Sequence, residues 1–139
     1  MAHYAVHSPF ETDERFISHY TDPNKSQQAR AFATLIEGMD KSLGDILDKL
    51  EDMGIAENTL IIFLGDNGGD APLGDAADYG SSAPFKGKKG SEYEGGVRVP
   101  FIVSWAHPNP NNKFQKAYPI ARNAIQTQMG TVMDIYPTV

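Results

Sequence analysis

The stretch that decides the fold reads TLIIFLGDNGGD over residues 59–70 and, further along, VRVPFIVSW over residues 97–105. Each part contains an apolar run of strand length bounded by turn residues, which is typical of buried strands in an α/β sheet. Polar residues follow the first run directly, and such sheets bind ligands at the carboxyl ends of their strands. We therefore predict an α/β fold with a mostly parallel sheet that contains residues 60–64 and 99–105.

Length and composition narrow the class of protein. The chain has 139 residues, which suits a single domain over residues 1–139. Its 12 lysine and arginine residues against 18 aspartate and glutamate residues give a net charge of −6, which argues against a nucleic-acid partner. The absence of cysteine excludes disulfides, thiolate metal sites and a cysteine nucleophile. We expect no membrane segment and see no signal-peptide pattern, so localisation stays open.

A long amphipathic helix is predicted ahead of the first strand, from about Pro23 to Met53. Asp22 would cap its start and Gly54 would end it. We expect this helix to pack on the sheet. A second helix is predicted over residues 126–136, a short strand over residues 4–7, and a mobile surface loop over residues 70–82. The apolar residues that repeat at helical spacing in the long helix are Phe32, Leu35, Ile36, Met39, Leu43, Ile46, Leu47 and Leu50.

Asp66 and Asn67 directly follow the first strand and are candidate metal ligands. Carboxylate and amide oxygens suit a hard divalent cation such as calcium or magnesium. The same Asp-Asn-Gly-Gly string is also typical of a simple turn, and both interpretations stay open from the local sequence. Two oxygens cannot complete a site that takes about 6–8 ligands, so the others would come from different segments or from substrate.

A cluster of cations, Lys86, Lys88, Lys89 and Arg98, stands against the acidic balance of the chain. Lysines placed between glycines can present positive charge to an oxyanion, although the spacing of a phosphate-binding loop is absent. A solvated basic loop is the alternative interpretation. His7, which precedes a Ser-Pro turn, is either a surface turn residue or a group that transfers protons.

Taken in order, several segments resemble the sulfatase family of the alkaline-phosphatase-like superfamily. The match covers nearly the whole chain, and the YEGGVRVP string over residues 93–100 is its most specific part. The resemblance implies a partial alkaline-phosphatase-like sandwich with a mostly parallel sheet packed by helices. The other matching strings are YAVHSP over residues 4–9, MDKSLG over 39–44, NTLIIF over 58–63, GDNG over 65–68, KGSE over 89–92 and DIYPT over 134–138.

The resemblance assigns a role to each candidate residue. Asp66 and Asn67 match the metal-binding pair of the family, which is usually on calcium. Lys89 matches the lysine that contacts the sulfate, and His7 matches the histidine beside the leaving group, which is implied to act as general acid. The set is chemically coherent, because cleaving an S–O bond builds negative charge that a cation and a lysine stabilise and a protonated histidine neutralises.

The chain also departs from the family pattern. The family nucleophile is a formylglycine made in a Cys/Ser-x-Pro-x-Arg string, and the nearest string, SAPFK over residues 82–86, ends in lysine and lies too late in the order. We interpret that string as a chance match. The early metal-binding aspartates have no counterpart either. The expectation is the later part of a sulfatase catalytic domain that lacks its nucleophile-bearing first half and is inactive alone.

Three functions are therefore weighed. The first is hydrolysis of a sulfate ester on a sulfated small molecule or glycan by the complete protein, whose relatives in the family are often exported. The second is hydrolysis of phosphate or phosphonate esters within the same superfamily. The third is a non-catalytic remnant that forms a homo-oligomer through exposed sheet edges.

Overall fold

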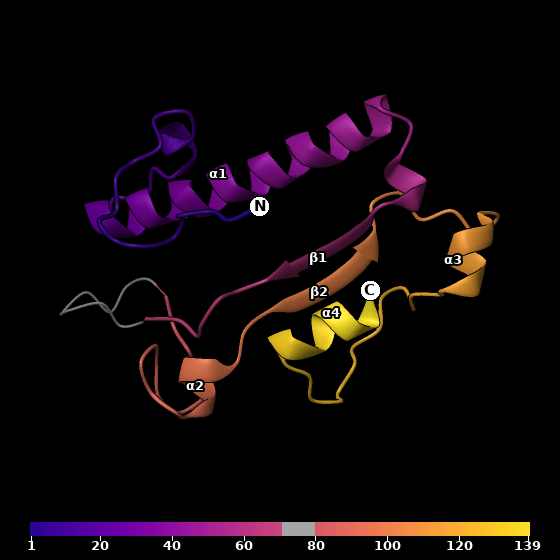
Figure 1. The fold of residues 1–139 in the computed structure, drawn as a ribbon. Helices are drawn as coiled ribbons and strands as arrows, with labels where there is room; N and C mark the ends of the chain where they lie inside the picture. The colour runs from indigo at the N-terminus through magenta and orange to yellow at the C-terminus, as the bar shows by residue number, and fades with distance from the viewer. Residues whose placement is uncertain (71–79) are drawn as a thin grey trace.

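A computed structural model describes residues 1–70 and 80–139, so most of the loop predicted over residues 70–82 lies outside the described residues. The described part is a mixed α/β arrangement (Figure 1). No helix in this part is both long enough and apolar enough to cross a membrane. The elements are η1 (Ile17–His19), α1 (Gln27–Asp52), η2 (Ala56–Asn58), β1 (Leu60–Leu64), α2 (Glu94–Val97), β2 (Phe101–Trp105), α3 (Lys113–Ala117), η3 (Val132–Asp134) and α4 (Ile135–Thr138).

The sheet consists of β1 and β2 in the described part of the chain, and the two strands run antiparallel. Leu60 pairs with Trp105 and Leu64 pairs with Phe101. The prediction of a mostly parallel sheet was therefore wrong for this pair. A parallel connection needs a crossover of a dozen or more residues, usually a helix. The only helix described between the strands is the four-residue α2, and the chain returns beside β1 in the opposite direction.

Helix α1 confirms the predicted long helix, but it begins later than predicted. The hydroxyl of Ser26, rather than the side chain of Asp22, caps the helix by accepting a hydrogen bond from Ala29 N over 3.0 Å. The predicted stop at Gly54 is confirmed, because this glycine has a φ of 67°. Gly54 N donates to Glu51 O and Ile55 N donates to Leu50 O, which together form a Schellman motif.

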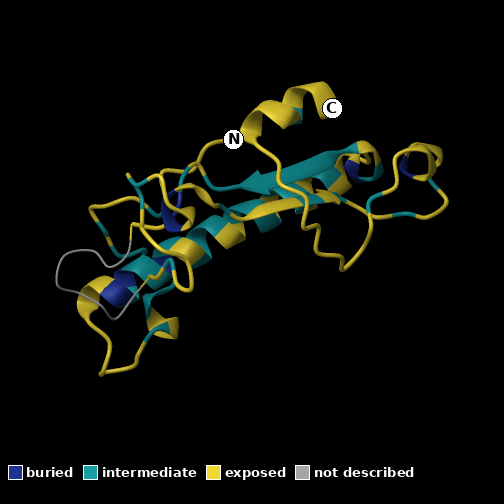
Figure 2. Ribbon diagram, turned by 90° about the horizontal axis from the view of Figure 1, so that it is seen from below, coloured by how far each residue is buried: buried dark blue, intermediate teal, exposed yellow. Residues whose placement is uncertain are grey.

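Helix α1 runs along the sheet (Figure 1). Apolar side chains of one face of α1 and of the two strands line a groove between them. The buried hydrophobic side chains of the described residues are those of Ala29, Ala31 and Ala56, and Figure 2 shows burial in short patches. The accessible surface is 10506 Å², whereas a compact protein of this mass exposes about 7,100 Å². The apolar side chains that line the groove are Ile36, Met39, Leu43 and Leu47 from α1 with Ile61, Phe63, Ile102 and Trp105 from the strands.

Two short elements differ from prediction. Residues 4–7 form a turn closed by His7 N and Tyr4 O at 3.0 Å, so the predicted strand is absent. Residues 126–131 are not helical, and helix begins only after Thr131, whose side chain and that of Asp134 form a reciprocal capping box. This strong start signal inside the predicted helix explains why the helical part is shorter than predicted.

Candidate anion and metal site

The polar loop after β1 carries Asp66 and Asn67 at the carboxyl end of that strand, where the sequence placed them. Gly65 N donates to Pro100 O over 3.3 Å, which continues the pairing just beyond the ladder. Asp66 is exposed to solvent. The side-chain Nδ2 of Asn67 donates to Gly68 O over 2.8 Å, so its amide oxygen is the atom left to face a cation.

The segment before β2 folds back against this loop. Lys89 N donates to Gly69 O over 2.9 Å, and Gly68 N donates to Gly96 O over 2.8 Å. These two hydrogen bonds join the loop of Asp66 and Asn67 to the loop of Lys89. The structure thus brings together the loops that carry three of the four predicted site residues, which are Asp66, Asn67 and Lys89.

The cations of this segment differ in what they contact. Lys86 lies over the ring of Tyr93, with its Nζ 3.9 Å from the ring centroid. Arg98 forms an ion pair with Glu94, and Lys88 forms one with Asp70 over 3.2 Å. Within residues 1–70 and 80–139, Lys89 forms no ion pair, and it is half-buried where the other three are exposed. Lys89 is therefore the cation of this cluster best placed to receive an external anion.

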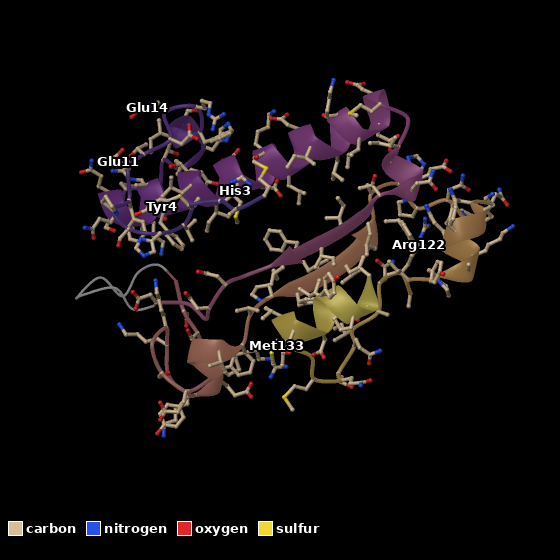
Figure 3. All side chains as sticks on the ribbon, viewed as in Figure 1. His3, Tyr4, Glu11, Glu14, Arg122 and Met133 are labelled. Carbon is tan, nitrogen blue, oxygen red and sulfur yellow. The ribbon has the colours of Figure 1, made fainter. Side chains whose placement is uncertain are left out.

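His7 is not joined to these loops by any hydrogen bond among the described residues. Its Nδ1 lies 2.7 Å from Ser8 O, and its ring lies 5.4 Å from that of Tyr4, which Figure 3 labels on the N-terminal segment beside α1. Because a carbonyl oxygen only accepts, Nδ1 carries the proton of this hydrogen bond and Nε2 is left to exchange a proton with a ligand. His7 is exposed, which leaves Nε2 accessible.

The donor set fits part of a calcium site. Asp66 and Asn67 offer oxygens, which are the ligands that calcium takes, but calcium needs about 6–8 of them. Among the described residues, no group of three or more histidine, cysteine, aspartate or glutamate side chains is arranged to hold a metal ion. Asp66 and Asn67 alone are therefore an incomplete set of calcium ligands, because two side chains cannot supply the oxygens that the ion needs.

Ser82 and the glycines around it were missed as parts of this site by the sequence reasoning. The Ser82 hydroxyl lies 3.3 Å from both Gly69 O and Gly95 O, where it donates to backbone carbonyls of both loops. The signal available in the sequence was the paired glycines at positions 95 and 96, which often mark a close approach of two backbones.

A second polar cluster lies at the opposite end of the sheet and was also missed. The buried side chain of Gln115 donates to Glu57 O and His107 O and accepts from Asn109 N. The side chains of Asn109 and, to a smaller extent, Asn112 donate to the Glu57 carboxylate and hold its pKa below the ordinary value. These contacts tie α3 to η2, and the cluster is a structural network between two elements.

Comparisons with known proteins agree with the motifs. A family model described as Sulfatase matches residues 1–139. The chain is 30% identical over 128 residues to steryl-sulfatase of Mus musculus, covering 88% of this chain and 19% of that protein. It is 31% identical over 134 residues to N-acetylgalactosamine-6-sulfatase of Rattus norvegicus, covering 96% and 22%. A protein named sulfatase from Formosa agariphila is 35% identical over 129 residues, covering 85% and 20%.

A solved structure supports the same relationship. The crystal structure of Ps i-CgsB in complex with k-i-k-neocarrahexaose superimposes with a TM-score of 0.62 and 29% sequence identity, covering 73% of this chain and 21% of that one. The same protein without the oligosaccharide gives a TM-score of 0.62. The chain thus spans about a fifth of the length of the relatives it matches.

Proposed function

The chain belongs to the sulfatase family, and on that premise we propose that it supplies the lysine, the histidine and two metal ligands of a sulfate-ester hydrolase. The observation that carries the proposal is the joining of the two loops, which sets Lys89 beside the loop of Asp66 and Asn67. We propose that the helices and strands of this chain form part of an alkaline-phosphatase-like sandwich. The sequence contains no Cys/Ser-x-Pro-x-Arg string, so we expect the 139 residues alone not to turn over substrate.

The chemistry follows from the charges. The ammonium group of Lys89 binds a sulfuryl oxygen and stabilises the negative charge that develops as the S–O bond breaks. His7 donates a proton from Nε2 to the departing oxygen. Asp66 and Asn67 would hold a calcium ion, which when bound supplies further positive charge at the sulfuryl oxygens. These roles for His7, Lys89, Asp66 and Asn67 are those that the family resemblance implies.

The substrate class that we propose is a sulfated glycan or a smaller sulfate ester. Ps i-CgsB, whose structure resembles this chain, was crystallised with an oligosaccharide of the carrageenan type. That likeness supports a sulfated sugar as the substrate class. The acidic net charge of −6 makes the local cations the part of the chain suited to bind such an anion.

The test is an assay of the product of the complete reading frame that contains this sequence. Aryl sulfate and aryl phosphate serve as paired substrates, and the 139-residue chain is assayed beside it. We expect hydrolysis of the sulfate by the complete product and none by the 139-residue chain. Preference for the phosphate would replace the proposal with a phosphate-ester hydrolase. Turnover by the 139 residues would show that a nucleophile lies within them.

Calcium titration of the 139-residue chain tests the metal ligands separately, with Asp66→Ala as the control variant. Two oxygens provide a small part of a calcium shell, so we expect weak binding at most. Tight binding that depends on Asp66 would show that this chain holds the remaining ligands itself.

A second candidate function, a non-catalytic module that associates with itself, is favoured by one observation. The chain exposes 10506 Å², which is far above the area of a compact protein of its mass. Exposed apolar side chains on β2 include Phe101 at 51% and Ile102 at 59%. Such a surface favours association between open sheet edges.

A further inference from the structure

Three glycines shape the backbone of the proposed site. Gly68 lies where the loop of residues 65–70 meets the segment of residues 86–97 that carries Lys89, and Gly95 and Gly96 lie where that segment folds back on itself. Gly68, Gly95 and Gly96 are all buried. A Cβ atom added to Gly68 would lie 2.0 Å from Gly95 O, and one added to Gly95 would lie 2.2 Å from Gly87 O. A Cβ added to Gly96 would lie 2.2 Å from Ser91 O. Each atom that would be struck is backbone. At Gly68 it belongs to the facing segment, and at Gly95 and Gly96 it belongs to the segment that carries Lys89, so no side chain fits at any of the three positions unless the backbone moves apart.

Backbone hydrogen bonds hold the segments around these three glycines together. Gly68 N donates to Gly96 O over 2.8 Å, and Gly95 N donates to Lys86 O over the same distance. Lys89 N donates to Gly69 O over 2.9 Å. Buried backbone groups need such partners, because an unpaired one costs free energy. These backbone contacts hold the two loops at a fixed separation.

The hydroxyl of Ser82 adds a side-chain hydrogen bond between the same two segments. It is 3.3 Å from Gly69 O in the loop of Asp66 and Asn67 and 3.3 Å from Gly95 O in α2. A hydroxyl has one proton to donate, so it is shared between the two carbonyl oxygens. Removing this hydroxyl would weaken the contact between the two segments without adding any atom to it.

We infer that Gly68, Gly95 and Gly96 are positioning residues that fix Lys89 relative to Asp66 and Asn67. This inference rests on the proposed function, because a cation and an ammonium group can act on one sulfuryl group only at a set separation. An error of about 1 Å in such an arrangement is enough to cost most of its effect. The glycines hold that separation without touching the substrate.

The test is amide hydrogen exchange of the 139-residue chain, measured by NMR. The variants are Gly95→Ala and Gly96→Ala, and the matched control is Gly44→Ala, whose added Cβ would meet nothing within 4 Å. We expect the amides of Gly68 and Lys89 to exchange at least about tenfold faster in the two variants. The amides of α1 should keep their parental rates. The control should leave the amides of Gly68 and Lys89 unchanged.

Ser82→Ala covers the case in which the glycine variants do not fold. We expect a smaller acceleration of exchange at the same two amides, with α1 unaffected. Unchanged exchange of Gly68 and Lys89 in the folded glycine variants would overturn the inference. Unchanged exchange in Ser82→Ala together with general unfolding of both glycine variants would overturn it as well, because the glycines would then serve stability only.

A calcium titration separates positioning from a purely structural role. In the parent chain, calcium chloride that shifts the amide signals of Asp66 and Asn67 should also shift that of Lys89. In the folded variants, the first two signals should still move while that of Lys89 does not. If all three still move together, the inference fails. If the parent shows no shift at Asp66, the 139 residues bind too little calcium to report on the position of Lys89, and the exchange rates alone decide the inference.

Discussion

The backbone nitrogen of Lys89 donates a hydrogen bond to the carbonyl oxygen of Gly69 over 2.9 Å, although Gly69 follows β1 and Lys89 precedes the segment that leads to β2. Together with the hydrogen bond from Gly68 N to Gly96 O, this hydrogen bond sets Lys89 beside the loop of Asp66 and Asn67. Lys89 forms no ion pair within the described residues. Because both loops approach each other through glycine, their spacing depends on backbone geometry more than on side-chain packing. Asp66, Asn67 and Lys89 of the candidate site thus all lie in the connection between the antiparallel strands β1 and β2.

Replacing Lys89 with glutamine is expected to reduce the binding of inorganic sulfate to the chain. A hydrogen bond to a charged group contributes about 1.5–3 kcal/mol, so the dissociation constant should rise by roughly tenfold or more. Isothermal titration calorimetry measures the change. The control is Lys113→Gln, because Lys113 lies on α3 over the ring of Phe114. Equal losses in both variants would show that sulfate responds to overall charge and would contradict a specific role for Lys89.

The long helix could be predicted because its apolar spacing continues through many turns, which makes the signal strong. Its first residue could not, since Asp22 and Ser26 are both good caps and only the folded chain selects between them. The direction of β2 could not be predicted either. An apolar run of strand length is typical of a buried strand in either direction, and the choice depends on the path of the connection.

The candidate site was predictable in part. Asp66 and Asn67 were located by the end of an apolar run, and Lys89 by its cluster of cations and by family resemblance. The backbone contact of Gly68 with Gly95 was not predictable, because it joins residues far apart in the sequence. Whether His7 joins the others stays a prediction, since no hydrogen bond in the described chain links it to their loops.

Ser26→Ala should destabilise the chain by about 1 kcal/mol, because Ser26 accepts the hydrogen bond from Ala29 N that caps α1. The free energy of unfolding in urea measures this effect. Asp22→Ala is the matched control, since Ser26 and not Asp22 is the N-cap residue of α1, and the Asp22 carboxylate accepts hydrogen bonds from Asn24. A larger loss in the control than in Ser26→Ala would contradict the observed start of the helix.

The pH dependence of stability should report on Glu57. The pKa of this carboxyl is held below its ordinary value, chiefly by the side chain of Asn109 and then by that of Asn112. The unfolded chain therefore binds a proton at a higher pH than the folded chain does. The stabilising contribution is complete above the ordinary glutamate range and is lost as the pH falls through that range toward the folded pKa.

Glu57→Gln should consequently flatten the acid side of a plot of unfolding free energy against pH, since glutamine does not titrate. The exposed Glu11, labelled in Figure 3, provides the control variant Glu11→Gln. Thermal unfolding measured from neutral to acid pH gives both curves. Parallel curves for Glu57→Gln and the parent would show that the hydrogen bonds from the two asparagines do not favour the charged carboxylate.

Self-association follows from the exposed area of the chain. Its surface exceeds that of a compact protein of equal mass by about 3,400 Å², and interfaces of obligate complexes bury about 2,000–5,000 Å² in total. We expect size-exclusion chromatography with light scattering to show dimers or larger species. Ile102→Lys should shift the chain toward monomer, because a lysine on an edge strand opposes pairing with another strand.

The matched control for that substitution is Ile125→Lys, at a residue that is 93% exposed outside any helix or strand. It adds the same charge away from the sheet, so the oligomer should persist in it. Equal dissociation in the two variants would assign the effect to net charge. A monodisperse monomer of the parent chain at every concentration would contradict this prediction. It would show that the apolar groove between α1 and the sheet and the open strand edges stay exposed to solvent without driving association.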